Sequence, residues 1–200
     1  MTTLLLVPGS QRRDSYNARL LRDIAGRLTV RCAVDWLLPG DVDLPLFDQD
    51  LEANSAIVER VAAAHHRFEA CDGIIVASPE YNGLPTPYLK NLIDWVSRLA
   101  HIDQRFDNPF LDRPLLLCSA STGSSGGWVG MPHARALFTH VGCAVTDDFI
   151  SVPHAEQVWS GDAFEFDPFF AADIDDAVER VLQLAITGPR PTPHQVAAAC

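Results

Sequence analysis

The sequence predicts an α/β fold built on a doubly wound, five-stranded parallel sheet with the strand order 2-1-3-4-5. Strand-like and helix-like patterns alternate along the 200 residues, which favours a parallel sheet covered by helices on both faces. Residues 72–78 and 114–119 are short, continuous apolar runs bounded by turn residues, as expected of strands that are buried on both faces. The strand order is assumed from this alternation, because it is one of the common arrangements of doubly wound sheets.

The first strand and the helix after it follow from simple patterns. Residues 3–8 are an apolar run that ends at Gly9 and Ser10. Apolar residues then recur at the spacing of one buried helix face, at Leu20, Leu21, Ile24 and Leu28. A pattern of period two over residues 30–36 predicts the second strand.

The remaining elements continue the alternation. Residues 39–54 form a long connection with no firm element, and Asn54 and Ser55 can cap the next helix. That helix carries Ile57, Val61, Ala64 and Phe68 on one face, and the third strand follows at residues 72–78. Further strands are expected over residues 114–119 and within residues 144–152, with helices over residues 88–100, 133–141 and 171–186.

One domain accounts for the composition, because 48% hydrophobic and 20% charged residues suffice for a single compact core. We expect this domain over residues 1–187, followed by a disordered proline-rich tail over residues 188–200. The apolar first residues lack the features of a signal peptide and are too short to span a membrane. The five cysteines are widely spaced without a C-x-x-C pair, so a reducing cytoplasm is the expected compartment.

The charge of the chain restricts its partners. A formal net charge of −11 argues against nucleic acid and anionic membranes, because both require a basic surface. Arg12 and Arg13 can still hold a phosphate, since exposed charges are screened beyond about 8 Å at physiological salt. The seven histidines show no H-E-x-x-H spacing, and no metal site is expected.

Three polar segments follow the first, third and fourth predicted strands. The first loop, residues 9–17, has hydroxyls, an amide, an arginine and a helix start that suit a phosphate, although alone it fits an ordinary capped helix slightly better. The second loop, residues 78–83, is either a plain turn or a ligand edge with Tyr81 as a wall. The third loop, residues 119–127, is either a flexible surface loop or a close approach to a ligand. Because the carboxyl ends of neighbouring strands share one crevice, we expect a single site.

At these loops the chain resembles the NADPH-dependent FMN reductase family of flavodoxin-like proteins, which includes quinone, chromate and azo-dye reductases. The first loop has the G-S-x-R-x-x-S-x-N pattern of that family, the second has S-P-E-Y-N-G unbroken, and the third has S-x-S-x-G-x-x-G-G. The resemblance spans residues 4–152 and implies FMN as the cofactor. The cofactor-binding residues that we predict from it are Ser10, Arg12, Ser15, Tyr16, Asn17, Pro79, Glu80, Tyr81, Asn82, Gly83, Ser119, Ser121, Gly123, Gly126 and Gly127.

The resemblance also implies an activity. Hydride would pass from NADPH or NADH to FMN, and electrons would then leave to a small acceptor such as a quinone, an azo compound, chromate or free flavin. No catalytic side chain is implied, because the cofactor carries the chemistry. Trp128 and Val129 stand where many family members have a basic residue, and residues 84–87 are rich in proline. Both departures border the expected substrate face, so the choice of NADPH or NADH and the identity of the acceptor stay open.

Two other functions are weighed against this one. An FMN-binding electron carrier or sensor would receive electrons only from a protein partner. A serine hydrolase using Ser10 or Ser121 is the least favoured, because the sequence has no G-x-S-x-G elbow.

The helix over residues 88–100, from Tyr88 to Ala100, has an apolar arc that is too wide for one buried stripe. Either the long connection covers its second face or a second subunit does. The family resemblance favours a homodimer or homotetramer through this helix, with Tyr88 or Trp95 as an anchor. Residues 162–167 are interpreted as a loop packed on the domain, with a lid over the flavin as the weaker alternative.

Overall fold

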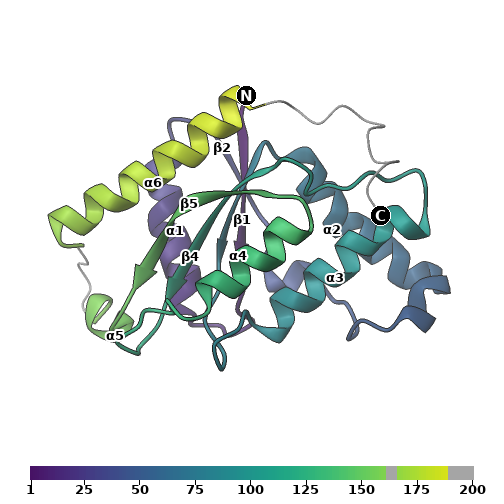
Figure 1. Ribbon diagram of the computed structural model, residues 1–200, viewed down its shortest axis with the longest axis horizontal. Helices are drawn as coiled ribbons and strands as arrows, with labels where there is room; N and C mark the ends of the chain where they lie inside the picture. Colours follow the sequence, from purple (N-terminus) through teal and green to yellow (C-terminus); the bar gives the residue numbers. More distant parts are fainter. Residues whose placement is uncertain (161–165, 189–200) are drawn as a thin grey trace.

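The computed structural model describes residues 1–160 and 166–188, and within them it has three layers, with helices on both faces of one sheet (Figure 1). All neighbouring strands are parallel and lie in the order β2-β1-β3-β4-β5, which confirms the predicted fold. The strands are β1 (Thr3–Pro8), β2 (Ala33–Trp36), β3 (Gly73–Ala77), β4 (Pro114–Ala120) and β5 (Ala144–Val152). The helices are α1 (Tyr16–Leu28), η1 (Pro39–Asp41), η2 (Gln49–Ala53), α2 (Ser55–Ala70), α3 (Pro87–Ile102), α4 (Met131–His140), α5 (Ala155–Val158) and α6 (Pro168–Thr187).

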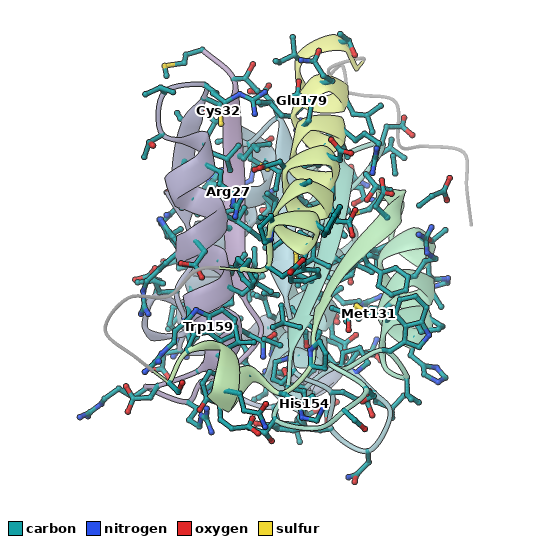
Figure 2. All side chains as sticks on the ribbon, turned by 90° about the vertical axis from the view of Figure 1, so that its left-hand side faces the viewer. Arg27, Cys32, Met131, His154, Trp159 and Glu179 are labelled. Carbon is teal, nitrogen blue, oxygen red and sulfur yellow. The ribbon has the colours of Figure 1, made fainter. Side chains whose placement is uncertain are left out.

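The two faces of the sheet are covered by different helices. Along β1, Leu4 and Leu6 pack with α1 and α6, whereas Leu5 and Val7 pack with α2, α3 and α4. Burial on both faces explains why β1, β3 and β4 are continuous apolar runs and not alternating ones. Figure 2 looks onto α1 and α6, which lie side by side, and Arg27 of α1 forms an ion pair there with Asp175 of α6.

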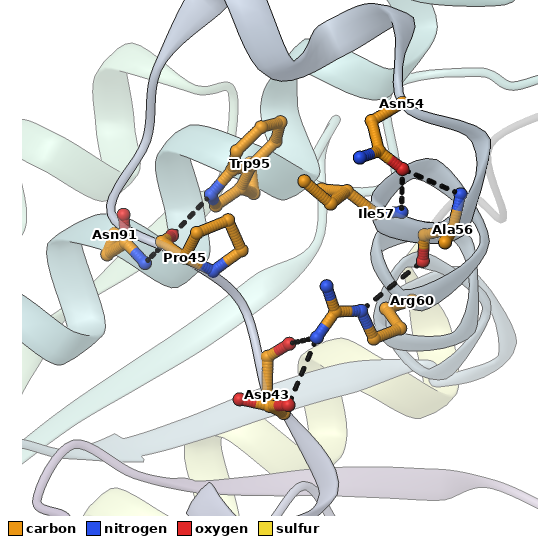
Figure 3. Close-up of polar contacts among 8 residues, drawn as sticks. All are labelled: Asp43, Pro45, Asn54, Ala56, Ile57, Arg60, Asn91 and Trp95. Carbon is orange, nitrogen blue, oxygen red and sulfur yellow. Dashed lines mark hydrogen bonds and ion pairs between the residues drawn. The ribbon is translucent and has the colours of Figure 1, made fainter.

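The second apolar face of α3 is covered by the long connection before α2. Trp95 is fully buried and meets the ring of Phe47 edge-on at a centroid distance of 4.9 Å. Its indole Nε1 donates a hydrogen bond of 2.8 Å to the carbonyl of Pro45, and Asn91 Nδ2 donates to the same oxygen at 2.9 Å (Figure 3). Trp95 is therefore unavailable as an anchor for a second subunit, and that part of the prediction is wrong. Whether the chain forms a homodimer or homotetramer stays a prediction.

The start of α2 is fixed as the sequence indicates. The side chain of Asn54 accepts hydrogen bonds from the backbone N–H groups of Ala56 and Ile57, at 3.1 and 3.4 Å (Figure 3). Other boundaries differ from the prediction. The second strand begins at Ala33 and not at Val30, because the turn that closes α1 leaves Val30 94% exposed.

Four cysteines are buried and have free thiols, namely Cys32, Cys71, Cys118 and Cys143. Burial raises the pKa of each thiol, and it raises that of Cys71 to about 12. No helix among residues 1–160 and 166–188 is long and apolar enough to cross a membrane. Apart from Gly188, the predicted tail lies outside the described residues.

The ends of β1, β3 and β4 are held in register at one edge of the sheet. The N–H of Gly9 donates to the carbonyl of Ala77 at 2.8 Å, and the N–H of Ser78 donates to that of Cys118 at 3.0 Å. A Cβ atom at Gly9 would lie only 2.9 Å from Cβ of Ser78, so glycine is required for this close approach. The first and second loops therefore leave the sheet in direct contact.

Candidate functional site

The first loop presents hydroxyl groups that the protein leaves largely unused. Ser15 occupies the N-cap position of α1, but its side chain makes no capping hydrogen bond. Ser10 accepts a weak hydrogen bond of 3.3 Å from the N–H of Arg12. Both serines are buried in this chain, at 7% exposure for Ser10 and 2% for Ser15. Together with the free N–H groups of the first turn of α1, they form a donor set suited to an anion.

Asn17 joins the first loop to the third. Its Nδ2 atom donates a hydrogen bond of 2.8 Å to the carbonyl of Ala120, and its Oδ1 atom accepts one of 2.9 Å from the N–H of the same residue. Asn17 and Ala120 are both almost fully buried. The amide thus acts as a brace between the start of α1 and the end of β4, a role that sequence reasoning missed.

The second loop is a tight hairpin that projects Tyr81. Tyr81 and Leu84 exchange two backbone hydrogen bonds, of 2.9 and 3.1 Å. The two residues between them, Asn82 and Gly83, have φ of 54° and 77°, so the loop is a two-residue turn of the kind that favours Asn-Gly. The turn interpretation is confirmed, and the same turn leaves the Tyr81 side chain half exposed at the edge of the site.

The third loop folds back onto the end of β4 and needs its double glycine. Gly126 and Gly127 have φ of 59° and 86°. A Cβ atom at Gly127 would lie 2.0 Å from Oγ of Ser119, and one at Gly126 would lie 2.4 Å from Oγ of Ser151. The Ser119 hydroxyl is fully buried and has no hydrogen-bond partner among the described residues. A buried hydroxyl without a partner is unfavourable, so a bound ligand or water is expected to satisfy it.

Two further contacts fix the third loop. The carboxylate of Glu80 accepts a hydrogen bond of 3.0 Å from the N–H of Gly130, at the start of α4, so the second and third loops are tied together. On the other side, the N–H of Ala155 at the start of α5 donates to the carbonyl of Ser121 at 3.0 Å. Most of the predicted loop or lid at residues 162–167 lies outside the described residues.

The three loops meet at one open cleft of about 230 Å³. Its lining consists of Ser10, Arg12, Ser15, Tyr16, Asn17, Pro79, Glu80, Tyr81, Ala120, Ser121 and Thr122. The other residues predicted for the site lie in the second and third loops without lining the cleft, namely Asn82, Gly83, Ser119, Gly123, Gly126 and Gly127. Ala120 and Thr122 were not singled out from the sequence, although they lie within the predicted third loop.

The chemistry of the cleft is that of a binding site more than of a nucleophilic centre. No histidine is among the described residues that line it, so neither Ser10 nor Ser121 has a histidine base there. His65, His66 and Glu69 of α2 have potential metal-ligating atoms within 4.8 Å of one another, but none of them lines the cleft. His65 Nε2 instead contacts the carbonyl of Asp107 at 2.8 Å, and His66 pairs with Glu69.

Comparison with known proteins gives one consistent result. The family model for NADPH-dependent FMN reductase matches residues 2–157. A quinone reductase of Escherichia coli (strain K12) is 31% identical over 137 residues, which are 68% of this chain and 69% of that protein. A probable NADPH:quinone oxidoreductase 1 of Oryza sativa subsp. japonica is 33% identical over 188 residues, covering 90% and 86% of the two chains.

Solved structures show the same fold. A flavoenzyme NAD(P)H:(acceptor) oxidoreductase from Paracoccus denitrificans superposes with a TM-score of 0.76 at 22% identity, covering 93% of this chain and 98% of that one. An NADH:FMN oxidoreductase in its apo form superposes with a TM-score of 0.67 at 15% identity, covering 98% and 97%.

Proposed function

This chain belongs to the NADPH-dependent FMN reductase family, with FMN as cofactor and a nicotinamide nucleotide as electron donor, and from this premise we propose that its acceptor is a small quinone. The observation that supports the cofactor site is the convergence of the three loops on one cleft. The names of the related quinone reductases support the choice of acceptor over azo compounds, chromate and free flavin.

The residues of the cleft fit a phosphorylated flavin. In this proposal Ser10, Arg12 and Ser15 hold the phosphate, because two little-used hydroxyls, a guanidinium and a helix start are the donors that a phosphate requires. At about 230 Å³ the cleft is smaller than FMN needs, so the ring would extend over the exposed Tyr81.

The chemistry that FMN supplies when bound is acceptance of hydride from the nicotinamide and delivery of electrons to the acceptor. The protein holds the bound cofactor and its substrates in position. Glu80 fixes the second loop against the start of α4, and Asn17 fixes the start of α1 against β4, so the walls of the cleft are set before any ligand binds. Tyr81 stands at the open side, where it can border the ring and limit access of water.

Reduction under anaerobic conditions tests this proposal. Protein loaded with FMN should lose its visible flavin absorption when NADPH or NADH is added, and should regain it when benzoquinone follows. In steady state, kcat/KM should be higher for benzoquinone than for an azo dye, chromate or free FMN. If an azo dye, chromate or free FMN gave a higher kcat/KM than benzoquinone, that compound would be assigned as the acceptor in place of the quinone.

Two other outcomes would contradict the proposal more deeply. A protein that takes up FMN, stays oxidised under both nucleotides and is reduced by dithionite would be an electron carrier or sensor. A protein that neither takes up FMN nor oxidises either nucleotide would contradict the cofactor site itself.

A further inference from the structure

Arginine side chains gather around Tyr16 at the mouth of the cleft. The guanidinium carbon of Arg12 lies 5.5 Å from the centre of the Tyr16 ring, and that of Arg19 lies 5.6 Å from it. Arg13 follows Arg12 in the exposed part of the first loop. Among residues 1–160 and 166–188, no carboxylate forms an ion pair with any of these three arginines. Within the described part of the chain, the guanidinium of Arg12 donates one hydrogen bond, to the backbone carbonyl of Asp14 at 2.8 Å.

The lack of carboxylate partners is unusual for this chain, whose formal net charge is −11. Most of its other described arginines are paired with an aspartate or glutamate, namely Arg27, Arg31, Arg60, Arg67, Arg98, Arg105, Arg135 and Arg180. The group around Tyr16 is therefore a local concentration of positive charge on an acidic protein. Such a concentration attracts an anionic ligand to the mouth of the cleft.

Tyr16 is held firmly enough to serve as a platform for these cations. Its ring stacks on that of Trp159 at a centroid distance of 5.8 Å and an interplanar angle of 21°. The indole Nε1 of Trp159 donates to the carboxylate of Asp23 at 3.1 Å, so the pair is tied to α1. Figure 2 shows Trp159 at the end of the molecule where α5 lies, beside the first turns of α1. A guanidinium resting on a fixed ring is already positioned for a ligand.

We infer that Arg19 binds the 2′-phosphate of NADPH and makes this nucleotide the preferred donor over NADH. The inference rests on the proposed function, in which Arg12, Ser10 and Ser15 serve the phosphate of FMN. Arg19, which lies beside the Tyr16 ring that lines the cleft, is then left for a second anion. The 2′-phosphate is the group by which NADPH differs from NADH, and a guanidinium binds a phosphate through charge-assisted hydrogen bonds.

Among the described residues that line the cleft, the second-loop side contributes no cation, and its one charged side chain is that of Glu80. Trp128 and Val129 are 57% and 56% exposed and present apolar surface near the second loop, where a Cβ atom at Gly83 would lie 3.7 Å from Val129. Apolar surface suits an uncharged ring and does not compensate a phosphate. The charge distribution therefore directs the phosphorylated end of the donor toward Tyr16 and Arg19.

A matched pair of variants tests the inference. Arg19→Gln removes the cation beside Tyr16, and Arg22→Gln removes an exposed cation one turn further along α1 that has no ion-pair partner among the described residues. Calorimetric binding of NADP⁺ and NAD⁺ to the oxidised, FMN-loaded protein is measured beside KM for NADPH and NADH. Arg19→Gln should weaken NADP⁺ binding and raise KM for NADPH by about tenfold, the lower end of what a hydrogen bond to a charged group contributes.

The same variant should leave NAD⁺ binding, KM for NADH and the affinity for FMN unchanged, and Arg22→Gln should leave all of them unchanged. Equal effects on both nucleotides, no effect on either, or an equal effect of Arg22→Gln would overturn the inference. Weaker FMN binding in Arg19→Gln would also overturn it, by assigning Arg19 to the cofactor phosphate. Failure of the proposed function would look different, because the unmodified protein would then oxidise neither nucleotide or would reduce another acceptor with a higher kcat/KM than benzoquinone.

Discussion

Replacing Asn17 with alanine should loosen the first loop from the third and weaken both the fold and the binding of FMN. The amide of Asn17 makes hydrogen bonds of 2.8 and 2.9 Å with the carbonyl and the N–H of Ala120. Both residues are at most 3% exposed, so the substitution leaves two buried backbone groups without partners. Each such group costs about 1–3 kcal/mol. Because the neighbouring cleft can admit water to both groups, we expect a loss of about 2–3 kcal/mol in the free energy of unfolding.

Urea denaturation of the FMN-free protein measures this loss, and quenching of flavin fluorescence measures the affinity for FMN. Asn54→Ala is the matched control, because it also removes two side-chain hydrogen bonds to backbone N–H groups, at the start of α2 and away from the cleft. It should cost about 1 kcal/mol of stability, as loss of an N-cap does, without changing the affinity for FMN. If Asn17→Ala unfolded at the same free energy as the unmodified protein and bound FMN equally well, the proposed brace would have no energetic role.

Three further predictions follow from the same structure. Arg12→Ala should weaken FMN binding by about 1.5–3 kcal/mol in a fluorescence titration, the scale of a charge-assisted hydrogen bond, and an unchanged affinity would place the phosphate elsewhere. Gly127→Ala should disrupt the third loop and FMN binding, because the new Cβ atom would lie 2.0 Å from Oγ of Ser119. Gly26→Ala is the control: no atom lies within 4 Å of its new Cβ, and the substitution should stabilise α1 by about 1 kcal/mol. If calorimetric melting gave the two variants the same stability, the steric argument would be contradicted. Burial raises the pKa of the four buried thiols, so a thiol reagent at pH 8 should label them only as the protein unfolds, and rapid labelling of the folded protein would contradict their burial. For the same reason, the free energy of unfolding should fall as the pH rises past the ordinary thiol pKa of 9.0.

The alternation of strands and helices and the convergence of the three loops on one cleft could be predicted from local patterns, whereas the strand order was assumed as one of the common arrangements. A parallel strand that is buried on both faces is apolar throughout, so residues 72–78 can be predicted as a strand without knowing which strands pair with it. The turn in the second loop could also be predicted, since Asn82 and Gly83 favour the positive φ that both adopt. Once such strands alternate with helices, the loops at their carboxyl ends converge by topology.

What could not be predicted depends on pairs that are distant in sequence. Asn17 and Ala120 are 103 positions apart, and an amide at the start of a helix indicates a cap or a ligand contact, not a brace to another strand. The apolar arc of α3 showed that a second face is buried but not what covers it. The covering residues, including Phe47, lie in a connection without helical or strand periodicity. With only four residues, α5 is too short for a periodic pattern.

A crystal structure of the protein with FMN tests the central claim most directly, since that claim concerns where one ligand meets three loops. The account predicts the phosphate within hydrogen-bonding distance of Ser10, Arg12 and Ser15, and the ring bordered by Tyr81 and by the third loop. Density for the phosphate outside the first loop, or for the ring away from Tyr81, would contradict it.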